Sequence, residues 1–594
     1  MRSILALLVL AAALVSAGAG SARDLALPGP DFGPNVLIFD PGMSTSQIKA
    51  AVDAVSAQQI SNQFGSQRYA LLFKPGTYGT TAAPLNFQVG YYTDVAGLGA
   101  SPGDVTINGT ADVFNQCFPD GCTALVNFWR SLQNLTIDVA GKTGCPGAGE
   151  FWATSQAAPM RRVHVNGFAT FMDFCSNPAF ASGGFVADSQ FSGSTIVNGS
   201  QQQYLVRNSD IDGWSNGVWN QVFAGVVNAP AQAFPSPPYT TLATVPASRE
   251  RPFLTVDSAG RWSVFVPDVR FDSSGTSWAA GRTRGHSIPI EDFFIAKPTD
   301  SVKTINNALA RGRNLLFTPG VYQVGDTIRV KRPDTIVLGL GMATLDAQNG
   351  VVPMTVEDTR GVEISGLIFD AGPVNSPVLL QVGKPHAHGS AIDRFDPTTL
   401  HDVFFRIGGP HLGKATESLE VNSDHVILDD IWAWRADHGS GVGWTSNTAD
   451  TGLVVNGDDV LATGLFAEHY QKYNVYWAGE NGKTIMFQNE LPYDPPDQAA
   501  YQHDGLLGWA AYKVAPSVKT HEGWGLGSYC FFNVDPTIHD SHAFEVPVTP
   551  GVKLHDILSL SITNHGTIDH VVNDVGAPTD ANTNPSNVVE YPTG

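Results

Sequence analysis

The chain of 594 residues carries 34 Lys and Arg against 55 Asp and Glu, a formal net charge of −21, and it is 43% hydrophobic but only 15% charged. This composition excludes a disordered chain and leaves room for a large core. The acidic balance argues against nucleic acid or an anionic membrane surface as the main partner, because both are bound through Lys and Arg, whereas a neutral polymer is compatible with it.

The first residues are typical of a secretion signal. Arg2 supplies a positive charge, the run from Ile4 to Val15 is apolar, and small residues up to Ala22 offer cleavage sites. The run is too short to span a bilayer comfortably, which disfavours a membrane anchor. We therefore expect residues 1–22 to be a signal peptide and the protein to be secreted.

Five cysteines would meet an oxidising compartment, in which disulfides form. Cys117 and Cys122 flank the turn-rich FPDG and are candidates for one bridge, and Cys145 and Cys175 are candidates for a second. Cys530 is expected to be a buried free thiol. The sequence alone does not fix the pairing, and no cysteine spacing indicates a zinc site.

One pattern occurs twice along the chain. LLFKPGTY at 71–78 matches LLFTPGVY at 315–322, and each copy follows a helix-like stretch and precedes Gly-Leu-Gly (46–59 and 97–99; 301–312 and 339–341). A chance match with six identical residues in eight positions and ordered flanks is improbable. The duplication therefore predicts two related domains.

Within each copy, short β-branched runs recur about every 20–25 residues between Gly, Asn and Asp, the spacing of one coil in a β-solenoid. Stacked coils bury side chains that one coil cannot, and the preceding helix would cap the open end. A β-sandwich array is the alternative, disfavoured by the repeated order of helix, PGxY and GLG. We predict an all-β protein with solenoids at 30–230 and 291–590, joined by a Pro-rich linker with a β-hairpin at 231–290.

The segment 430–530 concentrates aromatic and acidic residues. Flat rings stack on sugar C–H faces and carboxylates bind hydroxyls, so the mixture favours carbohydrate recognition over an aromatic ladder in the core. The aromatic residues are Trp432, Trp434, Trp444, Tyr470, Tyr473, Tyr476, Trp477 and Tyr493; the acids are Asp437, Asp458, Asp459, Glu468, Glu480, Glu490 and Asp494.

A spacing of 22 residues relates Glu468 to Glu490. If 22 is the local coil length, the two acids lie on adjacent coils about 4.8 Å apart, so one should keep its proton near neutral pH, as a general acid for glycosidic cleavage must. The apolar flanks in LFAEHY and MFQNELPY argue against an exposed acidic stripe. The same spacing relates Ser446 to Glu468, Trp444 to Phe466 and Gln488, and Asp437 to Asp459.

Two further features keep alternatives open. Asp458 and Asp459 could bind Ca²⁺, as in pectate lyases on parallel β-helices, but calcium needs more oxygen ligands than two neighbouring acids supply. In the first domain, Gln201 and Gln203 share a strand face. With Ser215, Asn216 and Asn220 they could face a cleft between the domains, or they could form a polar ladder inside the solenoid.

The doubled LLFxPGxY and GLG pattern, SPPYTTL, VNGDD, EHYQ and FQNELPYDPP resemble glycoside hydrolase family 55, in its bacterial branch, over about residues 34–590. The resemblance implies two tandem right-handed parallel β-helices of the pectin-lyase type. It also implies an exo-acting β-1,3-glucanase, or laminarinase, that inverts the anomeric configuration in a cleft between the two helices.

By the same resemblance, Glu490 is the general acid, and the catalytic water is held by Gln, Ser and Glu side chains, for which Gln201, Gln203 and Glu468 are the candidates. The implied substrate-binding residues are Trp434, Asp437, Trp444, His469 and Tyr493. No metal or cofactor is expected. The protein is expected to be a monomer that binds a β-1,3-glucan. A non-catalytic glucan-binding solenoid and a Ca²⁺-dependent polysaccharide lyase, with Arg435 as its base, remain the alternatives.

Overall fold

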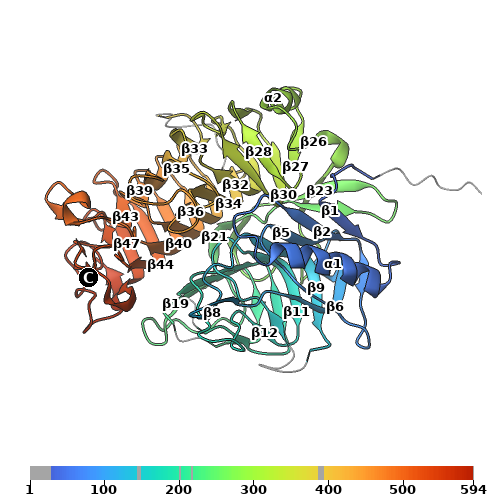
Figure 1. The fold of residues 1–594 in the computed structure, drawn as a ribbon, viewed down its shortest axis with the longest axis horizontal. Coiled ribbons are helices and arrows are strands. Elements are labelled where there is room, and N and C mark those ends of the chain that lie inside the picture. Colours follow the sequence, from blue (N-terminus) through green and yellow to red (C-terminus); the bar gives the residue numbers. More distant parts are fainter. Residues whose placement is uncertain (1–28, 143–148, 200–201, 216–217, 386–393, 593–594) are drawn as a thin grey trace, which may run out of the picture.

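The computed structural model describes residues 29–142, 149–199, 202–215, 218–385 and 394–592 (Figure 1). The predicted signal peptide, Cys145, Gln201 and Asn216 lie outside these residues. Both PGxY motifs follow a helix, as the sequence predicts: α1 (Thr45–Gln59) and α2 (Val302–Ala310). No helix in the described part of the chain has the length and apolar character needed to cross a membrane.

The first domain is a stack of parallel coils. Helix α1 begins with a capping box between Ser44 and Gln47 and buries Ile48, Val52 and Val55 in the core, so it caps the stack. The long sheet runs β1 (Val36–Phe39), β2 (Tyr69–Phe73), β5 (Thr93–Gly97), β9 (Arg130–Val139), β11 (Met160–Asn166), β13 (Phe185–Ala187), β16 (Gln203–Arg207), β19 (Asn220–Ala224) and β20 (Tyr239–Leu242); a short sheet is formed by β10 (Glu150–Phe151), β12 (Ala169–Thr170), β15 (Ile196–Val197) and β18 (Trp214–Ser215).

The linker continues from the last coil of this sheet into antiparallel structure. Strands β22 (Phe253–Val256), β23 (Trp262–Pro267) and β25 (Gly285–Pro289) form an antiparallel sheet that includes the hairpin around DSAG. A separate antiparallel pair joins β21 (Val245–Ser248) to β24 (Arg270–Ser273).

The second domain repeats the architecture with more coils. Its long sheet runs β26 (Phe293–Ala296), β27 (Asn314–Phe317), β30 (Ile336–Ala347), β32 (Glu363–Asp370), β34 (Thr399–Ile407), β36 (Ile427–Arg435), β38 (Leu461–Glu468), β40 (Gly482–Glu490), β44 (His521–Cys530), β47 (Val552–Ser561) and β49 (Ser586–Tyr591). The facing sheet runs β29 (Ile328–Val330), β31 (Met354–Val356), β33 (Ser376–Val382), β35 (Ala415–Val421), β37 (Ala449–Val455), β39 (Val475–Trp477), β43 (Tyr512–Val514) and β46 (Phe544–Glu545). The prediction of two tandem parallel β-helices is confirmed.

Alternation along each strand decides which side chains fill the core. Every second residue points inward, and the inward residues of successive coils stack in register. One such buried column consists of Leu367, Val403, Ile431, Leu465, Phe487, Leu526 and Ile557. The intervening residues of the same strands, Trp432 and Glu468 among them, therefore point out of the coil.

The outward faces of the two long sheets pack against each other, so the domains lie side by side (Figure 1). The shared apolar cluster includes Phe185, Leu205 and Val222 of the first domain and Phe404, Trp432 and Phe466 of the second. Buried ion pairs reinforce it: Arg161 lies 2.6 Å from Asp402 and Arg207 lies 2.6 Å from Asp429. Any outward side chain at the edge of this contact faces both domains.

The observed coil lengths confirm the 22-residue spacing for the coil from β38 to β40 and contradict it for the coil before. Phe466 of β38 pairs with Gln488 of β40, 22 residues further on, and His469 N donates to Glu490 O at 2.8 Å, as the spacing predicts. The preceding coil is longer: Trp432 pairs with Phe466 and Trp434 with Glu468. The equivalences of Trp444 with Phe466, Ser446 with Glu468 and Asp437 with Asp459 are therefore wrong, because a longer loop follows β36.

The structure also tests the predictions made for the cysteines. The bridge between Cys117 and Cys122 is present, and Cys530 is a buried thiol, as predicted. At the C-terminal end of the second domain, β49 pairs antiparallel with β47. A final reversed strand satisfies the open edge of the parallel stack.

Candidate active site

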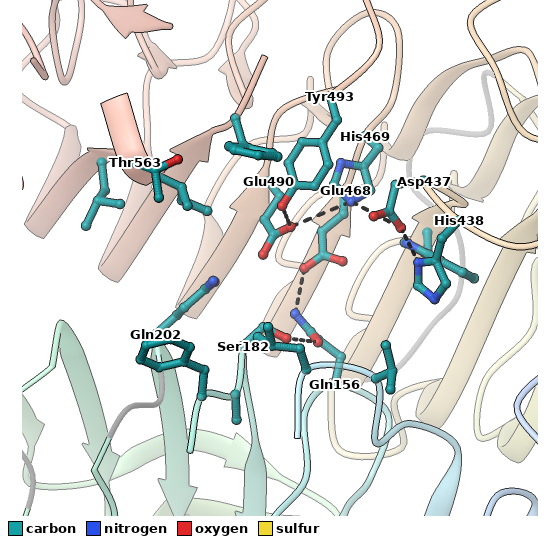
Figure 2. Close-up of a pocket in the computed structure, with 18 of the residues that line it drawn as sticks. Gln156, Ser182, Gln202, Asp437, His438, Glu468, His469, Glu490, Tyr493 and Thr563 are labelled. Atoms are coloured by element: carbon teal, nitrogen blue, oxygen red, sulfur yellow. Dashed lines mark hydrogen bonds and ion pairs between the residues drawn. The ribbon is translucent and has the colours of Figure 1, made fainter. Parts of the chain in front are cut away.

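A cavity of about 580 Å³ opens where the two β-helices meet (Figure 2). Both domains line it. The first domain contributes Leu125, Val126, Phe128, Gln156, Phe180, Ala181, Ser182, Gln202 and Trp219; the second contributes Trp434, Asp437, His438, Glu468, His469, Glu490, Tyr493, Phe531, Leu560, Ser561, Ile562, Thr563 and Asn584.

Two carboxyl groups stand at its centre. Glu468 ends β38 and Glu490 ends β40, on adjacent coils and on the outward face, so both point toward the first domain (Figure 2). Their exposed fractions are only 2% and 8%. The local register and the strand alternation together deliver two nearly buried acids to one cavity.

Glu490 is held from one side by its own loop and by the neighbouring coil. The Tyr493 hydroxyl donates a hydrogen bond to Glu490 Oε2, and His469 Nε2 lies 3.7 Å from the same oxygen. His469 Nδ1 lies 3.1 Å from the Leu491 carbonyl, which can only accept, so Nδ1 carries a proton and Nε2 faces the acid. Burial raises the pKa of Glu490, while the charge of His469 and the bond from Tyr493 oppose that rise.

Glu468 is held by both domains. Trp432 Nε1 donates to its Oε2 at 2.8 Å, and Gln156 Nε2 of the first domain donates to its Oε1 at 2.7 Å. Burial first, and then the charge of Glu490, raise the pKa of Glu468 well above its usual range. Because two carboxylates this close repel each other, the pair keeps one proton to a higher pH than an isolated carboxyl group would.

The first domain supplies a polar set across the cavity from Glu490 (Figure 2). Ser182 Oγ donates to Gln156 Oε1 at 2.6 Å, and Gln156 Nε2 also lies 3.0 Å from Gln488 Oε1. Gln488 Nε2 in turn donates to Gln202 Oε1 at 3.0 Å. Hydroxyl, amide and carboxyl groups converge there, as required to hold a water molecule.

These features have counterparts among known proteins. Residues 293–490 match the family model of the LAM55 pectate lyase-like domain. The chain is 52% identical over 565 residues to an exo-beta-1,3-glucanase of Streptomyces sp. (strain SirexAA-E / ActE), a match that covers 95% of this chain and 90% of the relative. The chain belongs to glycoside hydrolase family 55.

Solved structures agree with the family 55 assignment. The structure of sacteLam55A from Streptomyces sp. SirexAA-E has a TM-score of 0.89 at 51% identity, covering 95% of this chain and 99% of that one. A variant of sacteLam55A in complex with glucose has a TM-score of 0.88 at 50% identity, with the same coverage. The family 55 chain is therefore a glycoside hydrolase.

Four of the five substrate-binding residues predicted for this family 55 enzyme line the cavity: Trp434, Asp437, His469 and Tyr493. Asp437 accepts from His438 Nδ1 at 2.8 Å. Burial alone would raise the pKa of Asp437, but the bond from His438 and the charge of His469 outweigh it and lower that pKa to about 2. Asp437 is therefore ionised at every working pH.

Trp444 does not line the cavity of the family 55 enzyme. Its ring packs edge-on against Tyr501 at 6.3 Å, and Arg435 lies 5.7 Å above it. Trp444 lies in the longer loop that follows β36, which moves it out of the coil position that the 22-residue spacing assigned to it.

The predicted glutamines also need correction. Gln203 is fully buried in β16 and donates Nε2 to Gly525 O at 3.0 Å, away from the cavity, and Gln201 lies outside the described residues. The intervening Gln202 lines the cavity instead. Successive side chains point to opposite faces of a strand, so an error of one residue assigns every side chain of the strand to the wrong face. Asn220 is also buried away from the cavity, where it donates to Asp556 O at 3.1 Å.

Several lining residues carry no recognisable signal in the sequence. Gln156 and Ser182 lie in short irregular segments, and Gln156 meets Glu468 across 312 residues of chain. His438 belongs to no motif or spacing, yet its Nε2 lies 2.6 Å from Gln63 Nε2 of the first domain. Only the adjacency of His438 to Asp437 could have drawn attention to it.

The residues considered for lyase chemistry have other uses in the family 55 structure. Arg435 pairs with Asp494 at 2.8 Å and is not among the residues that line the cavity. Asp458 Oδ1 accepts from Glu480 N at 2.7 Å in a turn. The described part of the chain holds no group of three His, Cys, Asp or Glu side chains that could bind a metal ion.

Proposed function

We propose that this chain is a secreted, monomeric, exo-acting β-1,3-glucanase that hydrolyses laminarin-type glucans with inversion, with Glu490 as the general acid. The carrying observation is the nearly buried pair Glu468 and Glu490, which faces a polar set from the other domain. The names of the relative and of its glucose complex support a glucan substrate and exo action. The N-terminal segment supports secretion.

In this mechanism the chain end of a β-1,3-glucan occupies the cavity. Glu490 gives its proton to the departing glycosidic oxygen while a water attacks the anomeric carbon from the opposite face, and the C–O bond breaks as the new one forms. Gln156, Ser182 and Glu468 hold that water. The one proton that the acid pair keeps then resides on Glu490, and Glu468, a carboxylate that accepts from Trp432 and Gln156, takes up the proton of the water.

The surroundings of Glu490 fit the acid role at both stages. Before the reaction, burial favours the protonated form. After proton transfer, the carboxylate that remains is stabilised by the Tyr493 hydroxyl and by His469. Such preorganised donors act on charge that develops in the transition state.

The decisive experiment compares the parent enzyme with Glu490→Gln on laminarin, with products followed by chromatography and NMR of the anomeric protons. We expect the parent to release small α-anomeric products first, and the variant to lose at least about 10²-fold in kcat while binding is retained. Glu522→Gln is the matched control, since Glu522 lies outside the cavity lining and is 35% exposed at its side chain.

Each contrary result identifies a different error. Equal activity in Glu490→Gln would remove Glu490 as the acid, and β-anomeric first products would remove inversion. Binding without turnover in the parent would indicate a glucan-binding solenoid, and an unsaturated product formed only with Ca²⁺ would indicate a lyase. Size-exclusion chromatography tests the monomer, and detection of the mature chain in the culture medium tests secretion.

A further inference from the structure

A second cavity, of about 570 Å³, lies between the linker and the early coils of the second domain. We call it the linker cavity and define it by Arg249, Asp268, Phe271, Glu363, Phe395 and Asp396, which are among its lining residues. It shares no lining residue with the catalytic cavity.

The two cavities are well separated. Glu363 begins β32, and the register carries its position across four strand steps to Lys483 at the start of β40. Four steps amount to about 19 Å, and the seven residues from Lys483 to Glu490 to about 23 Å, so the cavities lie about 30 Å apart. A ligand of the linker cavity therefore does not occupy the catalytic site.

Two exposed rings mark its rim. Phe271 is 44% exposed and Phe395 is 60% exposed, and their ring centroids lie 5.6 Å apart. One comes from the linker and the other from the loop before β34. The Arg394 guanidinium lies 4.6 Å from the Phe395 ring centroid and places N–H donors beside it. Paired exposed rings next to hydrogen-bonding groups are suited to the C–H faces of a sugar.

The polar groups below the rim offer both acceptors and donors. Asp396 lies 3.3 Å from Arg249 and 3.2 Å from Arg360. At the floor, Glu363 is fully buried and lies 3.1 Å from Arg249 Nε, yet neither of its carboxyl oxygens accepts a hydrogen bond from the residues that the structure describes.

The charge balance limits the class of ligand. The four carboxyl side chains that line the linker cavity are matched by four guanidinium groups in or beside it, so no excess positive charge is left to attract an anionic ligand (Asp268, Asp334, Glu363 and Asp396; Arg249, Arg284, Arg360 and Arg394). In the described part of the chain these acids do not form a metal-binding group of three. A neutral, polyhydroxylated ligand satisfies the rings, the acceptors and the donors together.

We propose that the linker cavity is a second binding site for the neutral glucan, which retains the polymer while the catalytic cavity acts on its chain end. The identity of the polymer rests on the proposed function, whereas the existence of the site rests on the rings and polar groups of the cavity itself.

The test uses the full chain in the Glu490→Gln background, without and with Phe271→Ala and Phe395→Ala together, in native gels that contain laminarin. We expect the double substitution to weaken the retardation of the protein by laminarin roughly 3- to 10-fold in apparent Kd. In the active parent background we expect the same rise in KM for laminarin, with hydrolysis of laminaritriose unchanged.

Two controls guard this test. Phe118→Ala removes a comparably exposed ring, 48% exposed, from the first domain and should change neither readout. Asp268→Ala, at a 49% exposed side chain, should weaken retardation by the same route without removing a ring. Unchanged retardation in the double variant would overturn the second site, as would a parallel loss of laminaritriose hydrolysis. Failure of the parent to hydrolyse laminaritriose would instead refute the proposed function and leave the gel result to decide the site.

Discussion

Removing the hydroxyl of Tyr493 should move the pH dependence of the reaction in a defined direction. The hydroxyl donates to Glu490 Oε2 and so stabilises the carboxylate form of the acid. In Tyr493→Phe the ring can keep its contacts with His469 at 4.4 Å and Phe531 at 5.1 Å, so the substitution isolates the hydrogen bond. Loss of that bond should raise the pKa of Glu490.

The size of this rise follows from the burial of the acid. A hydrogen bond to a charged group contributes about 1.5–3 kcal/mol, and a tenfold change in an acid dissociation constant corresponds to about 1.4 kcal/mol, so the pKa of Glu490 should rise by about 1–2. Glu490 is only 8% exposed, which leaves water little room to replace the lost donor. In the proposed mechanism Glu490 is the general acid and must be protonated, so its pKa sets the alkaline limb of kcat/KM, and this limb should move to higher pH.

The assay is kcat/KM for laminaritriose across the pH range, for the parent, Tyr493→Phe and a control. Tyr512→Phe serves as the control, because Tyr512 is buried in the core of the second domain and its hydroxyl pairs with Thr484 and His521. We expect no movement of its alkaline limb. An unmoved or acid-shifted limb in Tyr493→Phe would refute the assignment of that limb to Glu490.

Two further predictions concern stability. Asp430 is fully buried with no hydrogen-bond partner for either carboxyl oxygen among the described residues, and burial, followed by the charge of Asp402, raises its pKa well above the usual range. The folded state therefore keeps a proton on Asp430 that the unfolded chain releases above about pH 4. Between the unfolded and the folded pKa of Asp430, the free energy of unfolding falls by about 1.4 kcal/mol for each rise of one in pH. Asparagine tolerates the φ of 60° at this position. Asp430→Asn should therefore be more stable than the parent at pH 7.5 but not at pH 3.5. Equal midpoints of denaturation at pH 7.5 would contradict this. Arg207→Met leaves Asp429 and Glu250, at 2.6 and 2.7 Å, buried without that partner and should cost about 3–5 kcal/mol in chemical denaturation, whereas Arg261→Met, at a 74% exposed side chain, should cost under about 1 kcal/mol. Similar losses in the two Arg variants would show that the buried ion pairs do not hold the domains together.

The parts of the fold that depend on local repetition were predictable. Runs of β-branched residues between Gly, Asn and Asp mark the coils, because stacked strands must bury their inward side chains in register. The spacing of Glu468 and Glu490 was informative for the same reason, since the loops that connect β38 through β39 to β40 are short and the register carries through this coil. Where the connection lengthens, as after β36, the spacing argument fails and Trp444 leaves the site.

The half of the site that comes from the first domain could not be predicted in this way. Gln156 reaches Glu468 across 312 residues, and no periodicity within either domain relates them. Their meeting depends on how two outward sheet faces pack, which is set by the aromatic cluster around Trp432 and by the ion pairs of Arg161 and Arg207. The sequence pointed to the correct segment but did not decide whether Gln202 or Gln203 faces the cavity, because a displacement of one residue exchanges the faces of a strand.

This division has a consequence for catalysis. In the proposed mechanism, the acid Glu490 and its partners Tyr493 and His469 belong to the second domain, while Gln156 and Ser182, which hold the water, come from the first. The distance between acid and water is therefore fixed by the domain interface and not by either β-helix alone. Because an inverting reaction needs room for a water between substrate and base, a small change in packing between the domains should lower kcat before it alters either fold.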